Sequence, residues 1–115
     1  MTPQRARRVF GVETEYGLVG RRAGARGTRL SGGEAAQWLF TPIEREHASS
    51  NVFLRNGGRL YLDVGSHPEY ATAECATVDD LLVHERAGDE LVARLARRAE
   101  ADAAEQGEPV WLRLF

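Results

Sequence analysis

The sequence contains no lysine, a single cysteine and no long apolar run, and each absence excludes a class of site. All fifteen basic residues are arginine, so no side-chain ε-amine is available as a nucleophile or a modification site. Cys75 stands alone, which excludes an intrachain disulfide and a paired-cysteine metal site. No apolar stretch approaches the length that crosses a bilayer, and glutamates interrupt the segment after the basic N-terminus, unlike a signal peptide. We therefore expect a cytoplasmic protein.

Length and charge indicate one small globular unit. The chain has 115 residues, enough for a single hydrophobic core, and a net charge of −2. General nucleic-acid binders carry a basic excess, which is absent here. We therefore expect neither nucleic acid nor a membrane as a partner, and we treat residues 1–115 as part of one domain.

Periodicity predicts an α+β fold. Capping residues and helical spacing predict one helix from Ser31 to about Pro42 and a longer one from Thr77 to near Gly107. Asn56-Gly57 is a hairpin turn signal, and 20–29 and 43–49 are predicted as loops. We expect an antiparallel-rich sheet with two helices on one face. Alternating residues predict its strands at 8–17, 51–55, 59–64, 69–75 and 110–115.

Two glutamates stand two residues apart in the first predicted strand. Glu13 and Glu15 therefore point to the same face. Like charges held that close repel unless a cation neutralises them, and Mg²⁺ commonly binds one or two carboxylates together with substrate phosphates. The simpler interpretation is a solvated strand face. The spacing alone favours this simpler interpretation, because two glutamates at this spacing are a weak signal.

A second same-face set, Arg59, Tyr61 and Asp63, lies on the predicted strand 59–64. Arginine suits phosphate because its guanidinium donates paired hydrogen bonds, and a carboxylate can hold a metal or act as a general base. The simpler interpretation is a cross-strand ion pair on an exposed face. Glu69 and Glu74 follow directly and weaken that interpretation. The pattern is compatible with a Mg²⁺–nucleotide site without establishing one.

His67 and Cys75 have simple interpretations. His67 precedes Pro68 in a predicted turn, where a histidine is more often a local hydrogen-bonding residue than a ligand or proton carrier. Cys75 ends a predicted strand with no base motif around it, so we expect a small buried residue rather than a nucleophile. The other two histidines have no companions and are assigned no role.

Three stretches of the chain closely resemble the N-terminal part of the Pup-ligase family: FGVETEYG, SSNVFLRNGGRLYLDVGSHPEYATAEC and HERAGDEL. The resemblance runs from about Arg8 to the end of the chain. The family shares its fold with Pup deamidases (depupylases) and, more distantly, with glutamine synthetases, so the resemblance implies a glutamine synthetase-like ligase domain. The short 18–50 segment and the DVGSHPEY motif resemble the ligase. The depupylase is the alternative with the same fold.

The resemblance implies a reaction that tags proteins for proteasomal degradation. With ATP and Mg²⁺, the C-terminal glutamate of Pup, a small ubiquitin-like protein, is joined through a γ-glutamyl phosphate to lysines of protein substrates. Asp63 is implied as the general base that deprotonates the lysine. Arg59 and Thr72 are implied to contact ATP. The resemblance assigns the metal site to four residues: Glu13, Tyr61, Glu69 and Glu15.

The implied site requires Glu69 and Thr72 to point into one site, and the length of family members bears on whether this chain is active alone. Glu69 and Thr72 face opposite ways under simple alternation, so a shared site needs an irregular strand, with the break expected at 65–68. Family members run to several hundred residues, so we expect an N-terminal part of the ligase domain that is inactive alone. A degenerate, non-enzymatic binding domain is a further alternative, which the presence of the candidate residues opposes.

Overall fold

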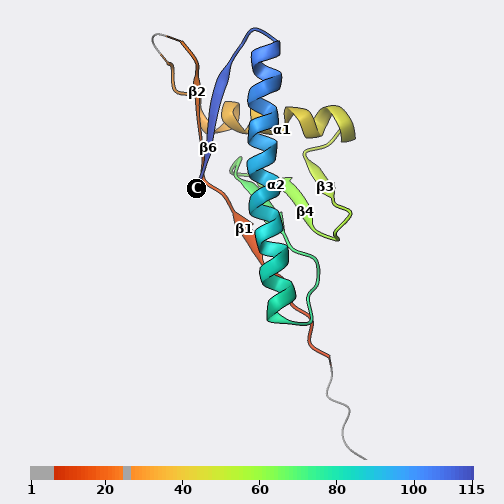
Figure 1. The fold of residues 1–115 in the computed structure, drawn as a ribbon. Helices are drawn as coiled ribbons and strands as arrows, with labels where there is room; N and C mark the ends of the chain where they lie inside the picture. Colours follow the sequence, from red (N-terminus) through yellow and green to blue (C-terminus); the bar gives the residue numbers. More distant parts are fainter. Residues whose placement is uncertain (1–6, 25–26) are drawn as a thin grey trace, which may run out of the picture.

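The computed structural model describes residues 7–24 and 27–115, which form two antiparallel sheets and two helices (Figure 1). The fold class predicted from the sequence is confirmed as α+β, with the strands divided between two sheets. In chain order the elements are β1 (Glu13–Glu15), β2 (Leu18–Arg22), α1 (Gly32–His47), β3 (Asn51–Phe53), β4 (Arg59–Leu62), β5 (Pro68–Ala71), α2 (Val78–Glu105) and β6 (Val110–Leu114).

The larger sheet has the strand order β1-β5-β4-β3, with every neighbouring pair antiparallel. The predicted hairpin turn at Asn56-Gly57 joins β3 to β4. Gly57 has a φ of 84°, a backbone conformation that glycine adopts without strain. A second turn, at 63–67, joins β4 to β5, and the Asp63 N–H donates to the His67 carbonyl across it. These short connections bring the predicted site residues of β4 and β5 side by side.

The smaller sheet pairs β2 with β6, in the register Gly20 opposite Leu112. The prediction of a loop at 20–29 was therefore wrong for its first residues, because the pairing partner lies far away in the sequence. Gly20 makes this strand possible. A Cβ there would lie 2.9 Å from Leu30 and 3.0 Å from Ala35. Local composition indicated flexibility, but here glycine allows close packing against α1.

Helix α1 begins where the sequence predicted and ends later. The Ser31 hydroxyl accepts a hydrogen bond from the Glu34 N–H at 3.2 Å, as in a capping box. The prediction that Pro42 ends the helix or that 43–49 forms a loop was wrong, because α1 continues to His47. Proline removes one backbone donor, and the Thr41 hydroxyl donates to the Gln37 carbonyl nearby. Burial of the Pro42 ring keeps this part of α1 helical.

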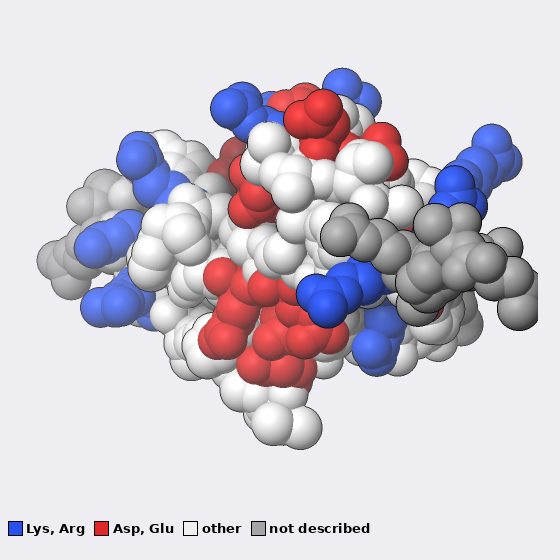
Figure 2. Space-filling model, turned by 90° about the horizontal axis from the view of Figure 1, so that it is seen from below, with Lys and Arg blue, Asp and Glu red and all other residues white. Residues whose placement is uncertain are grey.

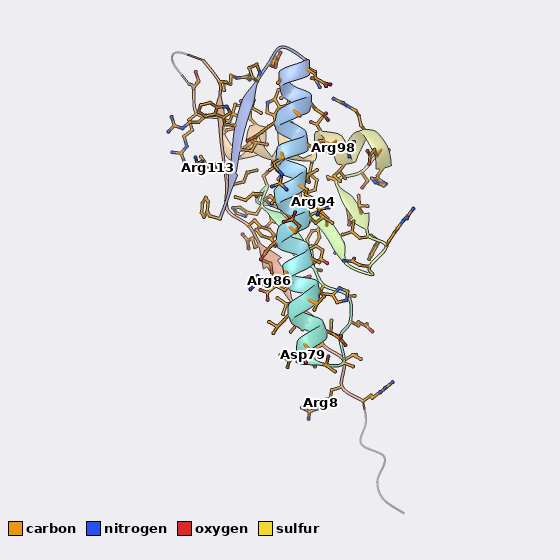
Figure 3. All side chains as sticks on the ribbon, in the orientation of Figure 1. Arg8, Asp79, Arg86, Arg94, Arg98 and Arg113 are labelled. Atoms are coloured by element: carbon orange, nitrogen blue, oxygen red, sulfur yellow. The ribbon has the colours of Figure 1, made fainter. Side chains whose placement is uncertain are left out.

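Helix α2 is the longest element and covers the apolar side of the fold. Its N-cap Thr77 accepts from the Asp80 N–H at 3.1 Å. The helix runs between the β2–β6 ribbon and the β3–β4 hairpin (Figure 1), with labelled charged residues such as Asp79 and Arg94 on its outer surface (Figure 3). Tyr70 of β5 packs against Gly88 of α2. Among the helices that the structure describes, none has the length and apolarity needed to cross a membrane.

Candidate functional site

The larger sheet has one apolar face and one polar face. On the apolar side, Leu60 and Tyr70 are 0% and 1% exposed and belong to the main core. Because successive residues of a strand alternate between faces, their neighbours Arg59, Tyr61 and Glu69 lie on the polar side. Acidic side chains gather on one surface of the molecule, with arginines toward its margins (Figure 2). The strands β4 and β5 therefore carry ionisable groups on one face, while their other face is buried.

The strand register arranges the polar face in two rows. One row places Glu69 between Glu15 of β1 and Tyr61 of β4. The next row contains Glu13, Ala71 and Arg59, in that order across β1, β5 and β4. The four residues assigned to the metal site are therefore neighbours on one face. Chain alternation predicted each same-face set, and the register now joins the two sets.

The Tyr61 phenol connects β4 to β1. Its hydroxyl donates a hydrogen bond to Glu13 Oε1 at 3.1 Å. To reach Glu13, the side chain crosses the intervening strand β5, on which Ala71 carries only a methyl group on this face. A hydrogen bond with Glu69, burial and the bond to Glu13 together raise the pKa of Tyr61 well above its ordinary value. The phenol therefore stays protonated and links two carboxylates as a hydrogen-bond donor.

Arg59 is held by two aromatic rings and one hydrogen bond. Its guanidinium lies 4.0 Å from the centre of the Tyr61 ring and 5.9 Å from that of Phe53. Its Nε donates to Asn51 Oδ1 at 2.7 Å. The simpler interpretation from the sequence, a cross-strand ion pair of Arg59, is not observed. Within the described chain, no carboxylate lies at ion-pair distance from this arginine.

Asp63 follows β4 and is fixed by its own turn. Its Oδ1 accepts from the backbone N–H groups of Gly65 and His67, each at 2.8 Å. Ser66 closes the turn with a φ of 61°. The backbone bond from His67, with a second from Gly65, lowers the pKa of Asp63. At neutral pH the side chain is a carboxylate whose other oxygen, Oδ2, accepts no backbone hydrogen bond.

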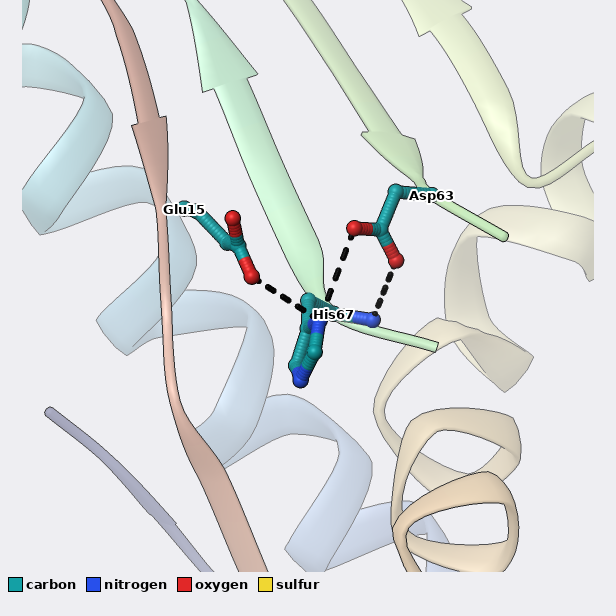
Figure 4. Close-up of side chains that lie close together, drawn as sticks. All are labelled: Glu15, Asp63 and His67. Carbon is teal, nitrogen blue, oxygen red and sulfur yellow. Dashed lines mark hydrogen bonds and ion pairs between the residues drawn. The ribbon is translucent and has the colours of Figure 1, made fainter. Parts of the chain in front are cut away.

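His67 brings Asp63 and Glu15 together (Figure 4). Its Nδ1 lies 2.9 Å from Glu15 Oε1 and 3.5 Å from Asp63 Oδ2. One ligand atom from each of these three residues falls within 4.8 Å of the others, a spacing that a cation could bridge. The sequence predicted local hydrogen bonding for His67 but missed its contact with β1. Only the pairing of β1 with β5 creates that contact, and no local pattern signals it.

Thr72 directly follows β5 and is hydrogen-bonded to Val12, the residue before Glu13. Its hydroxyl accepts from the Val12 N–H at 3.1 Å, and its own N–H donates to the Val12 carbonyl. The prediction of a strand break at 65–68 was wrong, since those residues complete the β4–β5 turn and β5 is regular from Pro68 to Ala71. The strand ends directly after Ala71.

Cys75, 2% exposed, is the small buried residue that the sequence predicted.

Known proteins match nearly all of this chain. The Pup-ligase protein family model matches residues 8–113. A Pup–protein ligase of Acidimicrobium ferrooxidans is 51% identical over 105 residues, which are 91% of this chain and 23% of the relative. The crystal structure of the complex between Pup and its ligase PafA has a TM-score of 0.83 and 45% identity, covering 95% of this chain and 21% of that one.

A further solved structure, of the Pup ligase PafA in complex with ADP, is 45% identical over 93% of this chain, with a TM-score of 0.49. This chain covers 23% of the Acidimicrobium ferrooxidans ligase and 21% of the ligase in the Pup complex, so it spans about a fifth of the length of the relatives it matches. The family model covers far more than half of the chain. This chain therefore belongs to the Pup-ligase family.

Proposed function

We propose that this chain supplies part of the active site of an ATP-dependent ligase that joins Pup to lysine side chains of proteins. The observation that carries the proposal is the polar face of the larger sheet, where Glu13, Glu15 and Glu69 lie beside a stacked arginine. Such a face suits the joining of two anions, a nucleotide and a carboxylate, whose repulsion must be screened. The similarity to Pup–protein ligases supports this choice of reaction.

The carboxylates of the face fit a magnesium ion. Oxygen ligands are those that Mg²⁺ prefers, and neither Glu13 nor Glu69 has an ion-pair partner among the described residues. We assign Glu13 and Glu69 as ligands, Tyr61 as a neighbour of the site and Glu15 as a supporting carboxylate. When bound, Mg²⁺ would neutralise phosphate charge. The remaining steps depend on the protein side chains.

Arg59 is assigned to an ATP phosphate, and Thr72 is kept as a second nucleotide contact. An oxygen of the glutamate γ-carboxylate of Pup attacks the terminal phosphorus of ATP, and ADP leaves. The lysine amine then attacks the acyl phosphate carbon, and phosphate leaves as the isopeptide bond forms. Arg59 orients the phosphate throughout by charge-assisted hydrogen bonds.

Asp63 takes the proton of the attacking lysine. Two backbone hydrogen bonds hold Oδ1, so Oδ2 is the oxygen assigned to receive the proton. The lowered pKa of Asp63 keeps this carboxylate ionised and ready to accept. It also makes Asp63 a weak base, so its contribution rests on position at the attacking nitrogen.

A graft tests the proposal, because this chain covers only about a fifth of its relatives. Residues 8–113 would replace the matching segment of the Acidimicrobium ferrooxidans ligase, and conjugation of Pup to a lysine-bearing protein would be measured with ATP. We expect conjugation by the graft and none by the chain alone. A graft that folds and binds Pup but forms no conjugate would contradict the proposal.

Asp63→Asn in the same graft tests the base. The asparagine oxygen can still accept the two backbone hydrogen bonds, so the turn should persist while proton transfer is lost. We expect conjugation to fall by roughly 10²- to 10⁴-fold. Conjugation at the unmodified rate would disprove the assignment.

Incubation of the graft with a preformed Pup conjugate distinguishes the ligase from the depupylase alternative, which predicts cleavage in place of ligation.

A further inference from the structure

Arg59 has one edge of its guanidinium occupied and the other available. Nε donates to Asn51 Oδ1 at 2.7 Å, and this bond sets the rotation of the guanidinium plane. The Tyr61 ring, 4.0 Å away, sets the plane's tilt. The two terminal nitrogens, Nη1 and Nη2, have no hydrogen bond to any residue that the structure describes.

The lack of an acidic partner is unusual on this face, which carries three glutamates. Tyr61 donates to Glu13 and also interacts with Glu69, while His67 contacts Glu15. These contacts keep the carboxylates on the β1 and β5 side, away from Arg59. The arginine is therefore held toward the β3 side with its terminal nitrogens open to an external anion.

Asn51 is well placed to fix the arginine. It lies opposite Tyr61 in the β3–β4 register. The Ser49 hydroxyl accepts from the Asn51 N–H at 3.1 Å and donates to the Asn51 carbonyl at 3.2 Å. These two bonds hold the backbone of Asn51 at the start of β3. Its amide oxygen is neutral, so it occupies Nε without cancelling the positive charge of Arg59.

We propose that Asn51 is a positioning residue that makes Arg59 bind a nucleotide phosphate end-on, through Nη1 and Nη2, instead of side-on through Nε. This inference rests on the proposed nucleotide-binding function and specifies how that site recognises phosphate. An end-on arginine donates two parallel hydrogen bonds to two oxygens of one phosphate group. Asn51 itself touches no ligand and acts through the orientation of Arg59.

A double-mutant cycle in the graft tests this role. Nucleotide affinity would be measured by titration calorimetry with ATP for the unmodified graft, Asn51→Ala, Arg59→Lys and the double variant. Lysine has no Nε–H in a guanidinium plane, so Asn51 should have nothing to orient in that background. We expect Asn51→Ala to weaken binding by about fivefold to tenfold beside Arg59, and to change it by less than about twofold beside lysine.

The outcomes are distinguishable. An equal loss in both backgrounds would mean that Asn51 acts on the fold or the ligand directly, and no loss beside Arg59 would mean that it does not orient the arginine. Either result overturns the inference. If Arg59→Lys binds too weakly for calorimetry, the KM for ATP in conjugation supplies the same comparison. An unmodified graft that folds but binds no ATP would instead refute the proposed function, and this inference with it.

Thermal unfolding provides the structural control for the cycle. The hydrogen bond between Asn51 and Arg59 is exposed, so its loss should leave the midpoint of unfolding nearly unchanged. A large drop in that midpoint together with the affinity loss in both backgrounds would identify Asn51 as a merely structural residue.

Discussion

The Nδ1 atom of His67 lies 2.9 Å from Glu15 Oε1, and this contact ties the β4–β5 turn to the first strand of the sheet. The same nitrogen lies 3.5 Å from Asp63 Oδ2. One imidazole thus sets the separation between a carboxylate assigned to the metal site and the carboxylate assigned as the base. These two groups come from segments almost fifty residues apart in the sequence.

Replacing His67 by alanine should loosen that separation. In the graft we expect kcat for conjugation to fall about tenfold, with KM for ATP little changed, as is common when a supporting residue of a site is removed. His67→Asn should retain most of the activity, since the asparagine amide nitrogen is as many bonds from Cα as Nδ1. Equal losses in the alanine and asparagine variants would show that the Nδ1 contact is not what matters.

Ala71→Leu should break the contact between Tyr61 and Glu13. The phenol reaches across β5 to Glu13, whose register partner on β5 is Ala71, so a larger side chain at that position should obstruct it. We expect the raised pKa of Tyr61 to move only part of the way back toward its ordinary value, because the hydrogen bond with Glu69 and burial, its two larger causes, remain. Ultraviolet titration of tyrosine ionisation measures this change. Tyr61→Phe is the matched control that identifies which tyrosine moves. An unchanged titration in Ala71→Leu would show that the ring takes a different path.

Gly88→Ala should destabilise the protein, although alanine is normally the better helix residue. A Cβ at this position would lie 2.2 Å from Tyr70 Cδ1, and Tyr70 is only 1% exposed and cannot move aside. We expect the free energy of unfolding to fall by about 1–3 kcal/mol in denaturant titration. Gly33→Ala is the matched control, because a Cβ there meets nothing within 4 Å. That variant should be neutral or gain up to about 1 kcal/mol.

Tyr16 should make stability sensitive to alkaline pH. Burial and the hydrogen bond that its hydroxyl donates to Asp89 Oδ1, at 2.7 Å, raise the pKa of Tyr16. The unfolded chain ionises this tyrosine near pH 10, so its contribution is fully present below about pH 10 and is lost progressively above it. No lysine titrates in this range to obscure the effect.

Tyr16→Phe provides the measurement. At neutral pH we expect it to lower the free energy of unfolding by about 0.5–1.5 kcal/mol, the contribution of one hydrogen bond. Above about pH 10 its stability should decline less steeply than that of the unmodified protein. Tyr61 has a raised pKa as well, so part of the decline should remain. Parallel stability curves above this pH would contradict the assignment.

Local sequence patterns predicted the elements that carry the candidate site. Alternation placed Glu13 with Glu15, and Arg59 with Tyr61, on common strand faces, and the register confirms both sets. The turn signal at Asn56-Gly57 was also correct. These predictions succeeded because each depends on residues close together in the chain.

The errors concern interactions between distant residues. Strand β2 exists because β6, near the other end of the chain, pairs with it, and α1 continues past Pro42 because that ring is buried in the fold. Likewise, no spacing rule could predict that His67 would reach β1. The roles of Asp63 and Thr72 in catalysis and nucleotide binding came from family resemblance and stay predictions.

Tyr70 gives the polar face a rigid support. Its ring is held against Gly88 of α2, and its hydroxyl accepts from Asn56 Nδ2 at 2.9 Å. The next residue back, Glu69, points to the opposite side of the same short strand. Close-packed interiors transmit displacement instead of absorbing it. A shift of α2 toward or away from the sheet would therefore move the carboxylate of Glu69. The position of this helix thus affects the geometry of the site, although none of its residues is a proposed ligand.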